Sequence, residues 1–219
     1  MLKWFFGASL AALALAGCGG DEQQAGETAP NIVQPGAPGE PSTTLSVEVL
    51  DRIEETPYVE ADVEFMQGMI HHHAQALRMT ALVPKRSAGA GIPLLAERID
   101  LSQVAEIEQM QAWLKARRQS VPVLHRPHGH AHGVGQGLMP GMLTEPELQR
   151  LERARGRAFD RLFLRFMIRH HEGALTMVRR LYAAGGGLEP EADSFARHVE
   201  ADQAIEIARM QQLLAGLAA

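Results

Sequence analysis

The second half of the chain repeats the first half, and this duplication restricts the possible folds more than any other feature. In segment 62–79, Asp62, Phe65, Met69, Ile70, His72, His73, Ala76, Leu77 and Met79 match Asp160, Phe163, Met167, Ile168, His170, His171, Ala174, Leu175 and Met177, 98 positions later. Further along, Gln103, Glu106, Ile107, Met110, Gln111 and Leu114 match Gln203, Glu206, Ile207, Met210, Gln211 and Leu214, 100 positions later. Two units with the same pattern are expected to have the same structure.

Each unit is predicted to be a short lead-in helix followed by a helical hairpin. Apolar residues recur at helical spacing over 58–83, 93–118, 157–183 and 190–216. Pro84 is expected to end the first of these helices, and Pro93 and Pro190 suit the first turns of others. Thr144 and Glu147 fit a capping box, and Ser46 is a cap candidate in the first unit. We therefore predict an all-α chain that forms an antiparallel four-helix bundle; two hairpins that fold separately are the alternative.

The N-terminal region predicts export. Residues 1–17 read as a signal peptide, because an apolar run too short to span a bilayer follows an early lysine. The segment that ends at Cys18 resembles a bacterial lipobox, in which the cysteine is lipidated and becomes the first mature residue. Residues 18–43 are rich in Gly, Pro and polar residues and are predicted to be a flexible tether to the membrane. Repeat one is assigned to 44–118, the linker to 119–142 and repeat two to 143–217, within a domain over 44–219.

The charge balance argues against a nucleic-acid partner. The formal net charge is −5, whereas proteins that neutralise phosphates carry a basic surface.

The repeated histidines and methionines are candidate metal ligands. Residues one helical turn apart can reach a common point, and this spacing joins Met69 to His73. A stripe with Glu106 and Met110 is expected on the partner helix. The full set of candidates in the two units is Met69, His72, His73, Met79, Glu106, Met110, Met167, His170, His171, Met177, Glu206 and Met210. Two other interpretations stay open: the methionines fill the core, or the glutamates bind the histidines structurally.

The linker carries a second metal-binding signal. His125, His128, His130 and His132 lie in a Gly-rich segment, and the last three form a His-x-His-x-His pattern. This composition is typical of metal-binding loops, although a solubilising linker has a similar composition. Thioethers favour Cu(I), and imidazole suits copper in either oxidation state. Copper is therefore expected before zinc or iron, with a copper-trafficking protein as a possible partner.

Known enzyme motifs are not met. The helices contain no Glu-x-x-His motif of the di-iron proteins, and Leu175 occupies the position of the second histidine of a zinc-protease motif.

The repeated Asp-x-x-Phe-x-x-x-Met-Ile-x-His-His-x-x-Ala-x-x-Met frame, the Glu-Ile-x-x-Met segments at 106–110 and 206–210, and MPGML at 139–143 resemble the DUF305 family of secreted bacterial proteins. The resemblance implies a ferritin-like helical bundle, export, and copper binding and resistance. Three hypotheses follow: an exported, lipid-anchored protein that binds or sequesters copper, a structural or interaction bundle without metal, and a redox enzyme that uses copper or iron.

Overall fold

The computed structural model describes residues 32–34, 41–45, 56–124 and 138–217 of a chain that divides into two units, 1–54 and 55–219. In the first unit, strands β1 (Ile32–Gln34) and β2 (Thr43–Leu45) form an antiparallel pair in which Val33 lies opposite Thr44. The sequence predicted no regular structure before residue 44. The two strands form because isoleucine, valine and threonine are β-branched and favour extended backbone.

The first hairpin of the second unit consists of α2 (Glu60–Thr80), the short α3 (Val83–Arg86) and α4 (Ile92–Ala116). Pro93 lies in the first turn of α4, as predicted. The prediction that Pro84 ends the first long helix was wrong: α2 ends at Thr80, and Pro84 lies in the first turn of α3. A first turn accepts proline because its N–H groups have no partner within the helix.

The second hairpin consists of α5 (Glu145–Arg153), α6 (Gly156–Ala183) and α7 (Pro190–Gly216). The capping box of α5 is confirmed. The Thr144 hydroxyl oxygen accepts from the Glu147 backbone N–H at 3.4 Å, and the Glu147 carboxylate accepts from the Thr144 N–H at 2.8 Å. The corresponding lead-in helix of the first repeat, with its Ser46 cap, lies outside the described residues.

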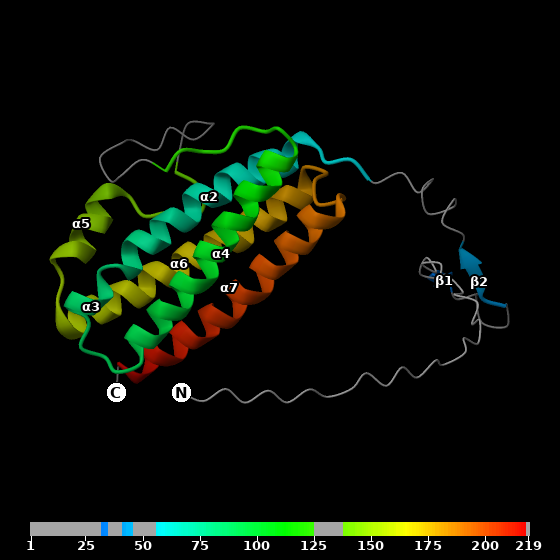
Figure 1. The fold of residues 1–219 in the computed structure, drawn as a ribbon. Helices are drawn as coiled ribbons and strands as arrows, with labels where there is room; N and C mark the ends of the chain where they lie inside the picture. The colour runs from blue at the N-terminus through cyan, green and yellow to red at the C-terminus, as the bar shows by residue number, and fades with distance from the viewer. Residues whose placement is uncertain (1–31, 35–40, 46–55, 125–137, 218–219) are drawn as a thin grey trace, which may run out of the picture. The chain divides into compact units, whose positions relative to one another are not determined.

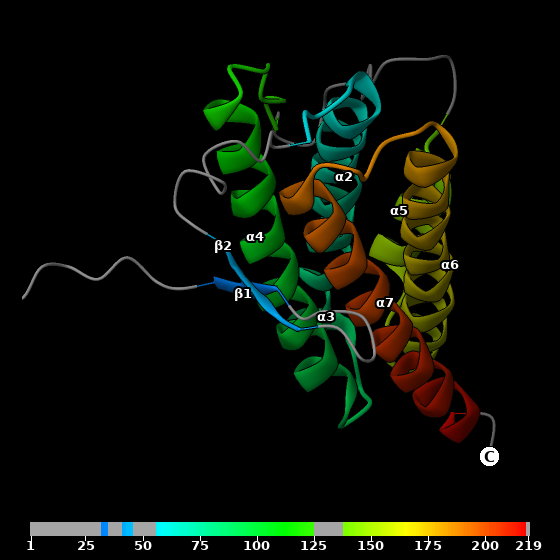
Figure 2. The ribbon, with the colours of Figure 1, turned by 90° about the vertical axis from the view of Figure 1, so that its right-hand side faces the viewer.

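The four long helices form a helical bundle (Figure 1). α2 packs on both α4 and α6, and α6 packs on α7. Within each hairpin the helices are antiparallel. Positions 67, 73 and 80 of the first repeat contact positions 120, 106 and 100, and positions 171 and 182 of the second contact positions 206 and 193. Figure 2 shows α4 and α5 on opposite sides of the helical unit. The described part of this unit is all-α, which confirms the predicted all-α class.

Two equivalent aspartates attach each hairpin to the turn of the other. The buried Asp62 carboxylate on α2 accepts from the Gly187 N–H at 2.6 Å, in the turn between α6 and α7. Asp160 on α6 accepts from the N–H groups of Ala88 and Gly89, at 3.2 and 2.9 Å, in the turn between α3 and α4. Charge-assisted hydrogen bonds of this kind are among the stronger ones. The aspartates of the repeated frame therefore join the two repeats to each other.

No helix in the described residues combines the length and the apolar character that crossing a membrane requires.

Candidate metal site in the histidine layer

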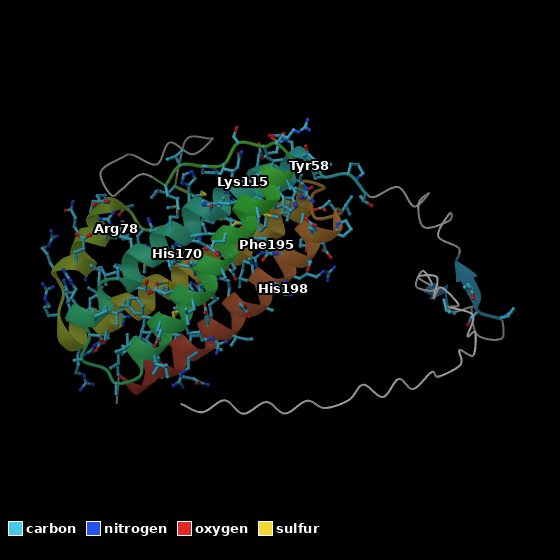
Figure 3. The ribbon with its side chains drawn as sticks, viewed as in Figure 1. Tyr58, Arg78, Lys115, His170, Phe195 and His198 are labelled. Atoms are coloured by element: carbon cyan, nitrogen blue, oxygen red, sulfur yellow. The ribbon has the colours of Figure 1, made fainter. Side chains whose placement is uncertain are left out.

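A buried polar layer crosses the middle of the bundle and separates two apolar clusters. The cluster toward one end contains Met69 of α2 and Met110 of α4, and the cluster toward the other end contains Met167 of α6 and Met210 of α7. Between them, each helix contributes two polar side chains with at most 8% exposure. This histidine layer consists of His72, His73, Gln103, Glu106, His170, His171, Gln203 and Glu206. Figure 3 labels His170 within the bundle.

One histidine of each repeat is paired with a glutamate of its own hairpin. The His73 Nε2–H donates to Glu106 Oε2 at 2.5 Å, and the His171 Nε2–H donates to Glu206 Oε2 at 2.7 Å. Both pairs occupy equivalent positions of the duplication. These hydrogen bonds match the alternative, left open by the sequence, that the glutamates bind the histidines structurally. Each glutamate contacts Nε2 of its histidine.

The other two histidines lie face to face across the interface between α2 and α6. The ring centroids of His72 and His170 are 3.8 Å apart, with the ring planes tilted by 35°. The His72 Nε2–H donates to the backbone carbonyl of Pro140 at 3.0 Å. Two imidazoles from equivalent positions thus meet where the two repeats are in contact.

Each histidine of the layer keeps at least one ring nitrogen without a hydrogen-bond partner in the described part of the chain. These atoms are Nδ1 of His72, His73 and His171, and both ring nitrogens of His170. The side-chain oxygens of Gln103 and Gln203 also lack partners. A buried polar atom without a partner costs about 1–3 kcal/mol, so such a concentration in one layer calls for an explanation.

Burial keeps His72 and His170, which we call the inner histidines, neutral. It is the main cause that lowers the pKa of His72 to about 3, and the nearby His73 lowers it further. Burial also lowers the pKa of His170 well below its usual value, with a further contribution from His72. Neutral imidazole is the form that binds metal ions.

Four of the predicted methionines border the layer. Met69, Met110, Met167 and Met210 are completely buried and lie within one helical turn of a layer residue on their own helix. The structure therefore brings soft thioethers close to the histidines. By contrast, Met79 and Met177 lie about 10 Å along their helices from the nearest inner histidine, at a rise of ~1.5 Å per residue, so they do not join the layer.

No group of three or more His, Cys, Asp or Glu side chains in the described ranges is arranged to hold a metal ion. His125, His128, His130 and His132 lie outside the described residues, as does the predicted lipidation site Cys18. A groove of about 530 Å³ is lined by Met110 and Trp113 of α4 and by Phe195 of α7. Its lining includes the thioether of Met110 but none of the layer's histidines.

The sequence did not predict the segment that covers His72. Residues 139–143 cross α2 and α6, and the Pro140 carbonyl approaches Gly173 of α6 so closely that a Cβ atom there would lie 2.0 Å from the oxygen. The available signal was a difference between the repeats: Gly173 stands where the first repeat has Gln75.

Several solved structures are similar to this chain. A DUF305 fragment from Deinococcus radiodurans is 35% identical, with 73% of this chain and 99% of that chain covered and a TM-score of 0.61. A DUF305 protein from Streptomyces coelicolor, described as secreted, is 28% identical, with 73% and 93% covered and a TM-score of 0.60. CopM in its Cu(II)-bound form is 27% identical, with 71% and 96% covered and a TM-score of 0.56. CopM also has Cu(I)-bound and Ag-bound forms.

No curated protein matches the sequence. The sequence does match the domain of unknown function DUF305 over residues 62–214, a range that contains the repeated histidine frame of both hairpins. The chain belongs to the DUF305 family.

Proposed function

We propose that this protein binds copper in its histidine layer and serves to bind or sequester the metal outside the cytoplasm. The observation that carries the proposal is the set of buried ring nitrogens without partners on four histidines in one layer. A metal ion bound there would satisfy these nitrogens. Water is a weaker candidate, because apolar clusters lie on both sides of the layer.

The hydrogen bonds around the layer support the same proposal. Histidines that bind metals usually donate their second ring N–H to a carboxylate or a backbone carbonyl, which orients the ring. His73 and His171 donate to glutamates, and His72 donates to the Pro140 carbonyl. In all three rings the nitrogen without a partner is Nδ1. These hydrogen bonds therefore leave Nδ1 as the nitrogen available to a metal ion in each of the three rings.

The nearby thioethers favour copper over zinc. Met69 precedes His73 by one helical turn, and Met167 precedes His171 in the same way. Thioether sulfur is a soft ligand that selects Cu(I). We therefore assign a mixed imidazole and thioether donor set, and CopM, with its Cu(I)-bound and Ag-bound forms, supports this choice.

Export and anchoring belong to the same proposal. The lipobox-like segment before Cys18 supports a lipid-anchored protein of the bacterial cell envelope or periplasm, and the secreted relative from Streptomyces coelicolor supports export. The ferritin-like assignment of the bundle is likewise proposed, on the basis of the two antiparallel hairpins.

A copper titration of the mature protein tests the proposal. Replacing His72, His73, His170 and His171 by alanine should abolish tight Cu(I) binding in a competition assay. Alanine at His125, His128, His130 and His132 should leave the tight site in place. His198→Ala is the matched control, because His198 is an exposed histidine on α7 (Figure 3).

Two further measurements exclude loss of folding as the cause. The double variant Met69→Leu and Met167→Leu conserves side-chain volume, so it should fold normally. Because it lacks both thioethers, its affinity for Cu(I) should nevertheless be lower than that of the wild type. Copper at 100 times its dissociation constant should stabilise the native wild type by about 2.7 kcal/mol. Unchanged copper stoichiometry in the variant without the four core histidines would show that the layer is not the site.

The His–Glu hydrogen bonds also fit a second function, a structural bundle without metal. In that case no metal should raise the melting temperature. Oxidation of Cu(I) or Fe(II) with turnover would instead support a redox enzyme.

A further inference from the structure

The segment Met139–Leu143, which we call the strap, contacts both α2 and α6 directly over the histidine layer. On α2, the Gln75 side chain donates to the Leu143 carbonyl at 3.0 Å and accepts from the Leu143 N–H at 2.7 Å. At the other end of the strap, Met139 Sδ lies 3.5 Å from the position that a Cβ atom of Gly68 would occupy. Between these two attachments, the Pro140 carbonyl accepts from His72.

On α6 the strap requires two glycines. Gly141 has a φ of +75°, and a Cβ atom there would lie 2.4 Å from the Arg169 carbonyl oxygen. At Gly173 a Cβ atom would lie 2.0 Å from the Pro140 oxygen and 2.5 Å from its carbonyl carbon. The atoms in the way belong to backbone, so they cannot move aside as the end of a flexible side chain could. The strap can contact α6 only because both positions lack a side chain.

The strap makes the two inner histidines unequal. His72 and His170 are equivalent in the duplication, but of the two only His72 is hydrogen-bonded to the strap. A carbonyl oxygen can only accept, so the ring nitrogen that contacts Pro140 must carry the hydrogen. In a neutral imidazole the other nitrogen, Nδ1, then has a free electron pair.

We propose that the strap is a positioning element that fixes the tautomer and orientation of His72 for metal binding, and that Gly173 is the residue that admits it. The inference rests on the proposed copper function, but the residues that it newly assigns a role, the strap and Gly173, are not proposed ligands. Outer partners of metal-binding histidines typically contribute 10- to 100-fold to affinity.

Gly173→Ala tests this directly, because the added methyl group must displace the Pro140 carbonyl. We expect about 10- to 100-fold weaker Cu(I) binding in a competition assay. In the metal-free protein, NMR of the imidazole nitrogens should show His72 with a protonated Nε2 in the wild type and a mixture of tautomers in the variant. Gly216→Ala is the matched control: Gly216 also lies on a helix, has no atom within 4 Å of its Cβ position, and should leave both measurements unchanged.

A second variant releases the strap without adding atoms beneath it. Gln75→Leu removes both hydrogen bonds to Leu143, and the exposed Gln211→Leu is its control. This variant should shift both readouts in the same direction as Gly173→Ala, which keeps the test informative if Gly173→Ala does not fold.

The two proposals fail in different ways. A wild type that binds no copper overturns the proposed function, while the tautomer of His72 still tests the strap in the metal-free protein. If Gly173→Ala and Gln75→Leu retain wild-type Cu(I) affinity within about twofold and keep the protonated Nε2 of His72, the strap is not a positioning element.

Discussion

His72 and His170 occupy equivalent positions of the duplication, and both are completely buried. Burial in a layer bordered by apolar clusters penalises the charged imidazole, which explains why the pKa values of both rings are lowered. The unfolded chain has no such penalty, and its histidines take up protons near the ordinary pKa of about 6.5. The two states therefore bind different numbers of protons in mildly acidic solution.

This difference predicts a specific loss of stability on acidification. Below about pH 6.5 the unfolded state binds protons that native His72 and His170 do not, so the free energy of unfolding falls as the pH falls. Each such histidine contributes a slope that rises toward about 1.4 kcal/mol per pH unit as the pH falls well below 6.5. His170→Leu should remove one contribution and make the slope shallower by that amount. Urea unfolding of the metal-free protein between about pH 7 and pH 5 measures it.

His198→Leu is the control for this prediction, because it also replaces a histidine by leucine but at an exposed position of α7. Equal slopes for wild type and His170→Leu would mean that His170 binds protons equally in the native and unfolded states, and would contradict the prediction.

Among the structural elements, the turns between helices depend on aspartates that lie far away in sequence. Asp62 accepts from the N–H groups of Val59 and Gly187, and Asp160 accepts from those of Ala88 and Gly89. Each carboxylate thus accepts hydrogen bonds from backbone N–H groups at a helix start or in a turn, and the N–H of Gly187 is buried. Both aspartates belong to the repeated frame in the sequence. The frame alone did not predict that each one accepts hydrogen bonds from the turn of the opposite hairpin.

Asp62→Ala should destabilise the protein by about 3 kcal/mol, because it leaves the buried N–H of Gly187 without a charged acceptor. Amide hydrogen exchange should accelerate at Gly187 in this variant, and at Ala88 and Gly89 in Asp160→Ala. Urea unfolding and exchange NMR measure the two effects. Glu64→Ala, an exposed change on α2, should stay within about 0.5 kcal/mol of the wild type. Accelerated exchange of the turn in the same repeat as the substitution, instead of the opposite one, would contradict the arrangement.

At the scale of the whole molecule, neither repeat has a core of its own. Each apolar cluster combines side chains from both hairpins: Trp113 shares one cluster with Phe195, and Ile99 shares the other with Phe159. The Trp113 indole N–H also donates to Glu189 of the second repeat at 3.1 Å. The alternative that each hairpin folds separately is therefore not what the structure shows.

Separated repeats should consequently fail to fold. A fragment of residues 56–124 and one of residues 138–217 should each show weak helicity and no cooperative unfolding, because half of every cluster would be exposed to water. An equimolar mixture should regain helicity and unfold cooperatively. Far-UV circular dichroism during urea titration is the measurement, and cooperative unfolding of either fragment alone would contradict the shared cores.

Features that depend on neighbouring residues were determined by the sequence alone. The first turns at Pro93 and Pro190 and the capping box of Thr144 follow from local backbone chemistry, and the duplication by itself identifies the paired histidine frame. Local chemistry gave the wrong prediction at Pro84, since a proline is compatible both with the end of one helix and with the start of the next. The helix periods also grouped Met79 and Met177 with the histidines, because helical periodicity gives the direction of a side chain but not its depth along the bundle.

Only the tertiary structure decided which polar groups meet. A glutamate 33 residues from His73 could bind either a metal or that histidine, and the packing of α4 on α2 directs it to the histidine. The strap depends on the absence of a side chain at Gly173, which is a matter of space between elements distant in sequence. The sequence determined the helices and the chemistry of their inner faces, because these depend on local backbone preferences and periodicity. The partners of His72 and His170 depend on contacts between the two repeats, which no local pattern encodes.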